Sequence, residues 1–312
     1  MDQPRKHEQY DALIAACRAG MRLRTAVVHP CDESSLIGAV NAATLGLIEP
    51  VLVGPEARIR AMAEGLHVDL GSLQVVDMPH SHAAAEKAVQ MARAGEVYAL
   101  MKGSLHTDEL MAEVTRKEGG LRTARRMSHV YIMDVPTYPK PLFITDAAIN
   151  ISPTLEDKAD IVQNAIELAL ALRIERPKVA ILAAIETISS RIPSTIDAAA
   201  LCKMAERGQI SGGILDGPLA LDNAISHEAA MVKHINSAVA GEADILLVPD
   251  LEAGNMLAKE LSFLANADAA GIVLGARVPI ILTSRADNLR TRLASCAVAA
   301  LYACALRGTV KV

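Results

Sequence analysis

Short runs of β-branched and other apolar residues alternate with longer segments of helical periodicity along this chain. Thr25–Val28, Val97–Met101 and Ile245–Val248 are examples of the short runs, which have the length and composition of buried strands. Leu155–Arg173 is the clearest helical segment, because its apolar residues form one stripe and Thr154 precedes it as an N-cap. Strands separated by helices form mostly parallel sheets with helices on both faces. The alternation therefore predicts an α/β fold.

The same pattern continues through the rest of the chain. A last long helix is expected over Arg290–Leu306, with Gly308 beyond its end. No repeat with a period of about 20–50 residues is found. The other runs predicted as strands are Val51–Val53, Leu73–Val76, Val130–Asp134, Leu142–Thr145, Val179–Ala183, Ile210–Ile214, Gly271–Leu274 and Ile280–Thr283.

Size and composition predict how the chain is organised. A single core rarely grows beyond about 250–300 residues, so 312 residues predict two domains. Hydrophobic residues make up 51%, which is typical of a globular protein, and with no Trp and two Phe the core must be aliphatic. A formal net charge of −5 argues against a nucleic-acid-binding protein.

Three features indicate a cytoplasmic protein without a membrane partner. The five Cys are odd in number and form no Cys-x-x-Cys pair, so neither a disulfide framework nor a zinc site is suggested. The N-terminal MDQPRKHEQY lacks the apolar core of a signal peptide. No uncharged apolar run reaches the roughly 18 residues that would cross a bilayer.

Ligands of open α/β folds bind beyond the carboxyl ends of the strands, and chemically informative residues stand there. After the strand Val97–Met101, Gly103 permits a tight turn, and Ser104 and Thr107 offer hydroxyls. The free N–H groups at the start of the next helix complete a possible anion cradle. The alternative is an ordinary junction, in which Thr107 is only an N-cap and His106 only a hydrogen-bonding residue.

Two further strand ends carry acidic residues. Asp216–Pro218 is a turn signal after a predicted strand, and Asp222 could cap the helix that follows. Asp250, Glu252 and Asn255 cluster after another strand, and their oxygens could coordinate Mg²⁺. Their spacing matches no recognised metal motif. Structural hydrogen bonding or ligand positioning is therefore favoured, and no metal is expected.

The fourth strand end carries Ser284, Arg285 and Asp287 directly after Thr283. An arginine fork can hold two phosphate oxygens at once. The alternative is that Arg285 and Asp287 form a surface ion pair of little energetic consequence. Four strand-end clusters in one chain favour a functional site more strongly than any one of them does.

Six segments, taken in order, carry the motifs of a known enzyme family. They are MKGSLHTDELM (101–111), RMSHVYIMDVPTYPKPLFITDAAINISPT (126–154), PKVAILAAIETISSRIPSTIDAAAL (177–201), ISGGILDGPLALDNAIS (210–226), VAGEADILLVPDLEAGN (239–255) and PIILTSRADN (279–288). Together they resemble the phosphate acetyltransferase/phosphate butyryltransferase family. The order GPLALD, VAG, PDLEAGN is specific, whereas residues 1–100 match more loosely. TSRAD looks more like the butyryltransferase branch than the acetyltransferase branch.

The resemblance implies a two-domain fold like that of isocitrate and isopropylmalate dehydrogenases. Residues 1–127 and 279–312 would form one domain and 128–278 the other, with the active site in the cleft between them. Such enzymes are usually dimers. They move a short acyl group, acetyl to butyryl, between coenzyme A and inorganic phosphate. Coenzyme A is then a substrate, and no cofactor is expected.

The resemblance also implies roles for individual residues. In a direct transfer within a ternary complex, Arg285 would orient phosphate, Ser284 would hydrogen-bond the thioester carbonyl, and Asp287 would exchange a proton with sulfur.

Two other functions stay open: a catalytically silent acyl-CoA-binding or regulatory protein, and an oxidative decarboxylase of the same fold. The candidate substrate-binding residues are Lys102, Gly103, Ser104, His106, Thr107, Asp216, Asp250 and Asn255.

Overall fold

The computed structural model describes residues 8–18, 22–284 and 287–308, and the chain divides into two compact units. The terminal unit comprises Tyr10–Arg125 and Ala270–Val312, and the middle unit comprises Met1–Gln9 and Arg126–Ala269. The boundaries between the units fall after Arg125 and after Ala269, whereas the sequence predicted domain boundaries at 127/128 and 278/279. Each unit has its own sheet region and its own covering helices, and each is described by itself.

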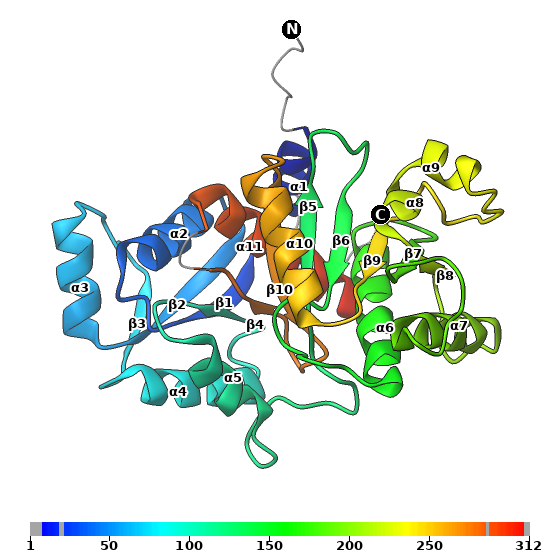
Figure 1. Cartoon of the computed structure of the whole chain (residues 1–312). Coiled ribbons are helices and arrows are strands. Elements are labelled where there is room, and N and C mark those ends of the chain that lie inside the picture. Colours follow the sequence, from blue (N-terminus) through cyan, green and yellow to red (C-terminus); the bar gives the residue numbers. More distant parts are fainter. Residues whose placement is uncertain (1–7, 19–21, 285–286, 309–312) are drawn as a thin grey trace, which may run out of the picture. The chain divides into compact units, whose positions relative to one another are not determined.

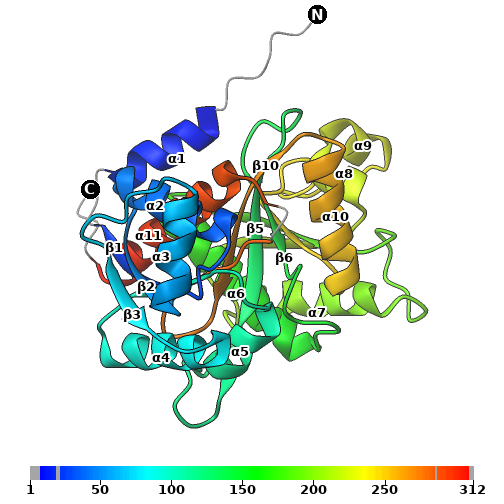
Figure 2. The ribbon, with the colours of Figure 1, turned by 90° about the vertical axis from the view of Figure 1, so that its left-hand side faces the viewer.

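The terminal unit has the strand order β3-β2-β1-β4-β11-β10. Its strands are β1 (Leu23–Val28), β2 (Ile48–Gly54), β3 (Gln74–Asp77), β4 (Ala99–Lys102), β10 (Asp268–Leu274) and β11 (Ile280–Ile281). All neighbouring pairs are parallel except β10 with β11. Helices α2 (Glu33–Thr44), α3 (Glu56–Gly65) and α11 (Leu289–Leu306) cover one face, and α4 (Ser81–Ala94) and α5 (Thr107–Thr115) cover the other (Figures 1 and 2). A further helix, α1, spans Glu8–Arg18.

Burial of the central strands explains their uniformly apolar sequences. All four residues of β4 are buried, and so are five of the six in β1. A strand covered by helices on both faces buries both sets of alternating side chains.

Among the described residues, one helix, α11, is long and apolar enough to cross a membrane, and 67% of it is buried inside the protein. Helix α11 is therefore packed as a core helix of the terminal unit.

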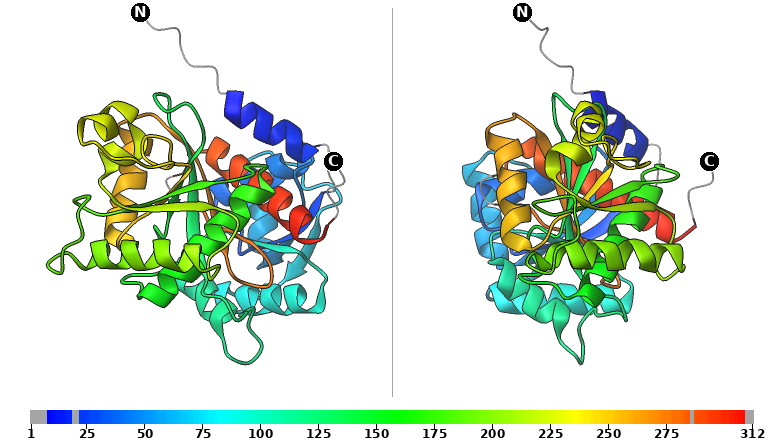
Figure 3. Two further views of the ribbon diagram at one scale, coloured as in Figure 1. Left: turned by 90° about the vertical axis from the view of Figure 1, so that its right-hand side faces the viewer. Right: turned by 45° about the vertical axis from the view of Figure 1, so that its right-hand side comes forward.

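The middle unit has the strand order β5-β6-β9-β7-β8. Its strands are β5 (Ser128–Asp134), β6 (Leu142–Thr145), β7 (Lys178–Leu182), β8 (Ile214–Leu219) and β9 (Ile245–Leu247), all parallel to their neighbours except β5 with β6. One face is covered by α8 (Leu221–Ile225), α9 (His227–Val232) and α10 (Leu251–Phe263), and the other by α6 (Leu155–Ala171) and α7 (Pro193–Glu206) (Figure 3). The predicted α/β architecture, with mostly parallel strands and helices on both faces, is confirmed.

Helix α6 begins where the sequence predicted. Thr154 is its N-cap: the Thr154 hydroxyl accepts from Asp157 N at 3.2 Å, and the Asp157 carboxylate accepts from Thr154 N at 3.1 Å. This reciprocal pair satisfies two backbone donors that the first helical turn leaves without partners.

The prediction for the segment around β8 is wrong in two respects. The strand does not span Ile210–Ile214 but begins at Ile214 and runs through Asp216–Pro218 to Leu219. Strand β8 lies at the edge of its sheet, where the missing N–H of a proline costs no ladder hydrogen bond. Asp222 does not cap α8, because Ala220 holds the N-cap position without a side-chain bond.

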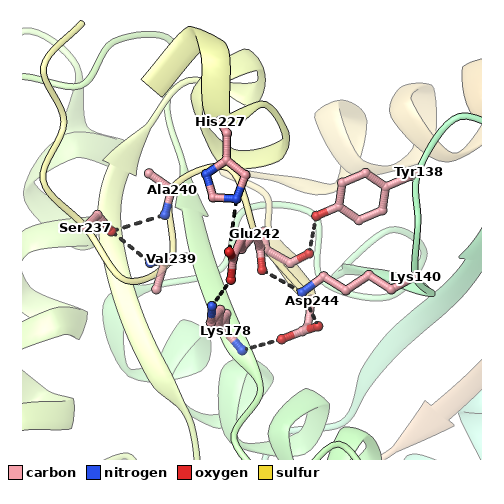
Figure 4. Close-up of polar contacts among 10 residues, drawn as sticks. Tyr138, Lys140, Lys178, His227, Ser237, Val239, Ala240, Glu242 and Asp244 are labelled. Carbon is pink, nitrogen blue, oxygen red and sulfur yellow. Dashed lines mark hydrogen bonds and ion pairs between the residues drawn. The ribbon is translucent and has the colours of Figure 1, made fainter. Parts of the chain in front are cut away.

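A network of polar contacts joins the starts of β6, β7 and β9 (Figure 4). The buried Asp244 carboxylate accepts from Lys178 N at 2.8 Å and pairs with Lys140 Nζ at 2.6 Å. The Tyr138 hydroxyl donates to Ala243 O at 2.6 Å, and burial, followed by the charges of Asp244 and Glu242, raises the Tyr138 pKa to about 12. Asp244 therefore connects the starts of β7 and β9 to the loop that precedes β6.

We expect Asp244→Ala to lower the free energy of unfolding by about 2–4 kcal/mol, because the Lys178 N–H and the Lys140 ammonium each lose a partner. Urea titration followed by circular dichroism measures the change. The control is Glu206→Ala, which removes an exposed ion pair with Lys203 and should change stability by less than about 0.5 kcal/mol. Equal losses of unfolding free energy in the two variants would contradict the proposed role of Asp244 in connecting the strand starts.

Candidate active site

Three loops of the terminal unit meet at the carboxyl ends of the neighbouring strands β1, β4 and β11. Val28, the last residue of β1, pairs with Lys102, the last residue of β4, and Ile281 of β11 pairs with Met101. Because these strands are parallel and in register, the residues that follow each strand lie at one edge of the sheet. This edge is the candidate active site.

The loop after β4 lies directly against the loop after β1. Gly103 N donates to Val28 O at 2.9 Å, and Ser104 N donates to His29 O at 3.0 Å. A Cβ atom at Gly103 would lie 2.3 Å from Val28 O and 2.7 Å from His29 O. Only glycine allows this approach, because the backbone carbonyls cannot move aside as a flexible side chain can.

Two further contacts join Ser104 and His29 through the serine hydroxyl. The Ser104 hydroxyl donates to His29 O at 2.7 Å, and His29 Nδ1 lies 2.9 Å from the same hydroxyl oxygen. A carbonyl can only accept and a hydroxyl has one hydrogen, so while the hydroxyl donates to His29 O it can only accept from Nδ1, which requires the tautomer with the proton on Nδ1. Burial, aided by the nearby charge of Arg58, lowers the His29 pKa and favours the neutral ring. To donate to a ligand, the Ser104 hydroxyl must rotate away from His29 O.

Asp32 connects the β1 loop to helix α2. As the N-cap, its carboxylate accepts from Ser35 N at 2.8 Å and from the Ser34 hydroxyl at 3.2 Å. Burial by itself would raise the Asp32 pKa, but the hydrogen bonds from Ser35 and Ser34 and the charge of Arg292 together lower it. Asp32 is therefore held as a carboxylate at the start of α2.

The loop after β11 closes on itself through Ser284 and Asp287. Ser284 N donates to the Asp287 carboxylate at 2.6 Å, and Asp287 N donates to Ser284 O at 3.2 Å. Burial raises the Asp287 pKa, although the Ser284 N–H and the charges of Arg292 and Lys102 oppose the shift. A carboxyl group that keeps its proton to higher pH than usual is suited to give and take a proton during a reaction.

Five residues predicted from the sequence come together at this sheet edge: Lys102, Gly103, Ser104, Ser284 and Asp287. Lys102 is buried, its Nζ lies 3.2 Å from Gly103 O, and its charge acts on Asp287. Arg285, the predicted phosphate ligand, lies outside the described residues.

His106 and Thr107 stand at the start of α5. His106 occupies the N-cap position, is exposed, and makes no side-chain cap hydrogen bond. Thr107 is the first helical residue, so its alternative assignment as the N-cap is wrong.

The remaining predicted residues belong to the middle unit, where each makes a hydrogen bond to a backbone group. The Asp216 carboxylate accepts from Gly217 N at 2.8 Å. Asp250 is the N-cap of α10 and accepts from Ala253 N at 2.9 Å, and Asn255 Nδ2 donates to Ala147 O at 3.1 Å. Among the residues that the structure describes, no group of three or more His, Cys, Asp or Glu could hold a metal ion.

Three residues at this sheet edge were not predicted from the sequence: His29, Asp32 and Arg292. The first two follow the predicted strand Thr25–Val28, so the rule that places ligands after strand ends would have included them. Arg292 lies in the second turn of α11, with its guanidinium 2.9 Å from the Thr283 hydroxyl. A single arginine in a helix carries no pattern that marks such a contact.

We expect Gly103→Ala to lower the melting temperature, with a cost of about 1–3 kcal/mol, because the added methyl group collides with two backbone carbonyls. Thermal unfolding of Gly65→Ala is the control, since nothing lies within 4 Å of a Cβ atom at that helical position. A Gly103→Ala protein as stable as Gly65→Ala would show that the two loops can separate at no cost.

Comparison with known proteins agrees with the sequence motifs. The family model described as phosphate acetyl/butaryl transferase matches residues 80–300. A phosphate acetyltransferase from Rhizobium meliloti is 66% identical over 300 residues, covering 96% of this chain and 95% of the relative. A phosphate butyryltransferase from Clostridium acetobutylicum is 40% identical over 296 residues, covering 95% and 98%.

A solved structure agrees as well. The branched-chain phosphotransacylase from Enterococcus faecalis V583 has 28% identity and a TM-score of 0.77, covering 90% of this chain and 99% of that one. The resemblance predicted from the motifs is therefore confirmed. The chain belongs to the phosphate acetyl/butyryltransferase family of acyltransferases.

Proposed function

We propose that this enzyme transfers an acyl group directly between coenzyme A and inorganic phosphate within a ternary complex, with Ser284 and Asp287 at the reacting atoms. The observation that supports this most strongly is the Asp287 carboxyl group. It is bonded to Ser284 N, and burial raises its pKa even though Lys102 and Arg292 lie near it. A carboxyl group in this state matches the proton transfer that thioester chemistry needs.

The reaction balances with one proton-transfer group. A phosphate oxygen attacks the thioester carbonyl carbon, the C–O bond forms, and the C–S bond breaks as the tetrahedral intermediate collapses. Asp287 gives its proton to the departing sulfur, which yields the acyl phosphate and coenzyme A as a thiol. In the reverse direction the Asp287 carboxylate takes the thiol proton. The Ser284 hydroxyl donates to the carbonyl oxygen as negative charge develops there.

Phosphate binding is assigned to Arg285 and to the loop after β4. Arg285 directly follows Ser284 in the sequence, and its planar fork suits two phosphate oxygens. Ser104 and Thr107, with the first N–H groups of α5, would complete the cradle. The Ser104 hydroxyl would then exchange its bond to His29 O for one to phosphate.

We assign supporting roles to the other predicted residues. Lys102 would contribute positive charge near the bound phosphate, and His106 would contribute a ring N–H donor. Asp216, in the middle unit, would bind substrate. Asp250 and Asn255 would hold their loops in shape through the hydrogen bonds to Ala253 N and Ala147 O. No cofactor and no metal enter this mechanism.

The proposed substrates are acetyl-CoA and phosphate, since the relative with 66% identity is a phosphate acetyltransferase. The TSRAD segment favours butyryl-CoA as the second substrate to test. We further propose a cytoplasmic homodimer that binds neither nucleic acid nor membrane.

Release of coenzyme A thiol from acyl-CoA, measured with and without phosphate, tests the function. Phosphate-dependent release that is unaffected by EDTA supports the proposal. Binding of acyl-CoA without release would favour a silent acyl-CoA-binding protein. Oxidation of a hydroxy acid with reduction of a nicotinamide cofactor, in place of thiol release, would favour an oxidative decarboxylase.

Arg285→Lys should weaken transition-state stabilisation by about 2–4 kcal/mol, mainly in phosphate use, because lysine keeps the charge but loses the planar fork. Ser284→Ala should lower turnover and leave the phosphate dependence nearly intact, because the proposed partner of its hydroxyl is the carbonyl. Initial rates against phosphate at saturating acyl-CoA separate the two effects. Wild-type behaviour of Arg285→Lys would refute the phosphate role of Arg285 and leave phosphate binding to the loop that contains Ser104.

Cys31→Ala should keep its turnover, although Cys31 N lies 3.4 Å from the Ser104 hydroxyl. Burial raises the Cys31 pKa, so its sulfur remains a thiol and is a poor nucleophile. Thiol release at saturating substrates, with thermal unfolding as the test of folding, measures the outcome. A folded Cys31→Ala protein without turnover would replace direct transfer by a covalent mechanism.

A further inference from the structure

Arg292 joins three segments of the terminal unit through its guanidinium group. Nη1 donates to the Thr283 hydroxyl at 2.9 Å, and Nη2 donates to Ser284 O at 2.9 Å and to the Ser34 hydroxyl at 3.1 Å. Thr283 and Ser284 follow β11, and Ser34 lies in the first turn of α2. Arg292 itself belongs to α11, which packs against α2 (Figure 2).

The Arg292 side chain is enclosed by the protein. Only 3% of Arg292 is exposed, and a Cβ atom at Gly38 of α2 would lie 3.0 Å from Arg292 Cδ. Burial lowers the Arg292 pKa, whereas Asp287 and Asp32 favour its charged form. An ordinary core position in this helix would hold an apolar residue, because a buried cation costs free energy unless it is paired and hydrogen-bonded.

We propose that Arg292 is a positioning residue for acyl transfer, which fixes the turn formed by Ser284 and Asp287 and sets the charge around the Asp287 carboxyl group. This inference rests on the proton-transfer role of Asp287 proposed above. Ser284 O accepts from Asp287 N at 3.2 Å and from Arg292 Nη2 at 2.9 Å, so the guanidinium holds the same carbonyl that Asp287 N binds. The same guanidinium anchors the turn to the start of α2 through Ser34.

The charge and the planar fork of Arg292 make separable contributions. The fork serves three acceptors at once, which a lysine ammonium on a flexible stem cannot reproduce in the same geometry. The charge, together with that of Lys102, opposes the effect of burial on Asp287. The titratable groups that act electrostatically on Arg292 are Asp287, Asp32 and Cys296. Those that act on Asp287 are Arg292 and Lys102.

Three variants test the inference: Arg292→Ala, Arg292→Lys and the matched control Arg307→Ala. Arg307 follows the end of the same helix and stacks on Tyr98, outside the proposed site. The readout is kcat against pH with acyl phosphate and coenzyme A as substrates, where Asp287 must be ionised. Each variant is also assayed with added guanidinium ion at millimolar concentration, and folding is checked by circular dichroism.

For Arg292→Ala we expect kcat to fall about 10- to 100-fold, because the reacting groups lose their alignment. Loss of the cation raises the Asp287 pKa further, so the acid limb of the profile should move up by about one pH unit. Guanidinium should restore part of kcat and move the limb back. Arg292→Lys should keep the acid limb near its wild-type position with a lowered kcat. Arg307→Ala should match wild type in all these respects.

Two outcomes would overturn the inference. If folded Arg292→Ala keeps the wild-type acid limb and shows no response to guanidinium, Arg292 is a structural residue only. If Asp287→Asn leaves the pH profile unchanged while the wild-type enzyme transfers acyl groups, the role of Asp287 is wrong and the inference fails with it. A wild-type protein without phosphate-dependent thiol release would instead refute the proposed function.

Discussion

The candidate site depends on the parallel pairing of β1, β4 and β11. In-register hydrogen bonds between these short strands place their carboxyl ends together, so loops that are about 75 and 180 residues apart along the chain become neighbours. Gly103 allows the closest contact, because its missing side chain leaves room for the carbonyls of Val28 and His29. The contacts between Ser104 and His29 require that strand order, because these residues follow two different strands.

Buried charge gives the site its chemical character. Asp32 is held ionised by the hydrogen bonds of an N-cap, whereas Asp287 is biased towards its protonated form by burial. The charge of Arg292 acts on both. Two carboxyl groups of the same type thus acquire different proton affinities from their surroundings.

The middle unit uses polar residues mainly to hold its own loops. Asp244 connects the starts of its central strands, and Asp250 and Asn255 bond to backbone groups at the opposite, carboxyl ends. Asp250 and Asn255 therefore make backbone hydrogen bonds, which agrees with the structural role that the sequence favoured over a metal site. An aspartate before a helix is more often an N-cap than a ligand.

The sequence by itself determined the α/β class, the family, and most of the strands, because apolar periodicity and strand-end motifs are local signals. It also predicted Ser104, Ser284 and Asp287 as site residues, and the structure brings them to one sheet edge. It failed at β8, where Asp216–Pro218 has the composition of a turn but lies in an edge strand that tolerates proline. Only the tertiary structure brought Arg292 to Ser284 O and His29 to Ser104. Such contacts depend on strand order and helix packing, which no short stretch of sequence encodes.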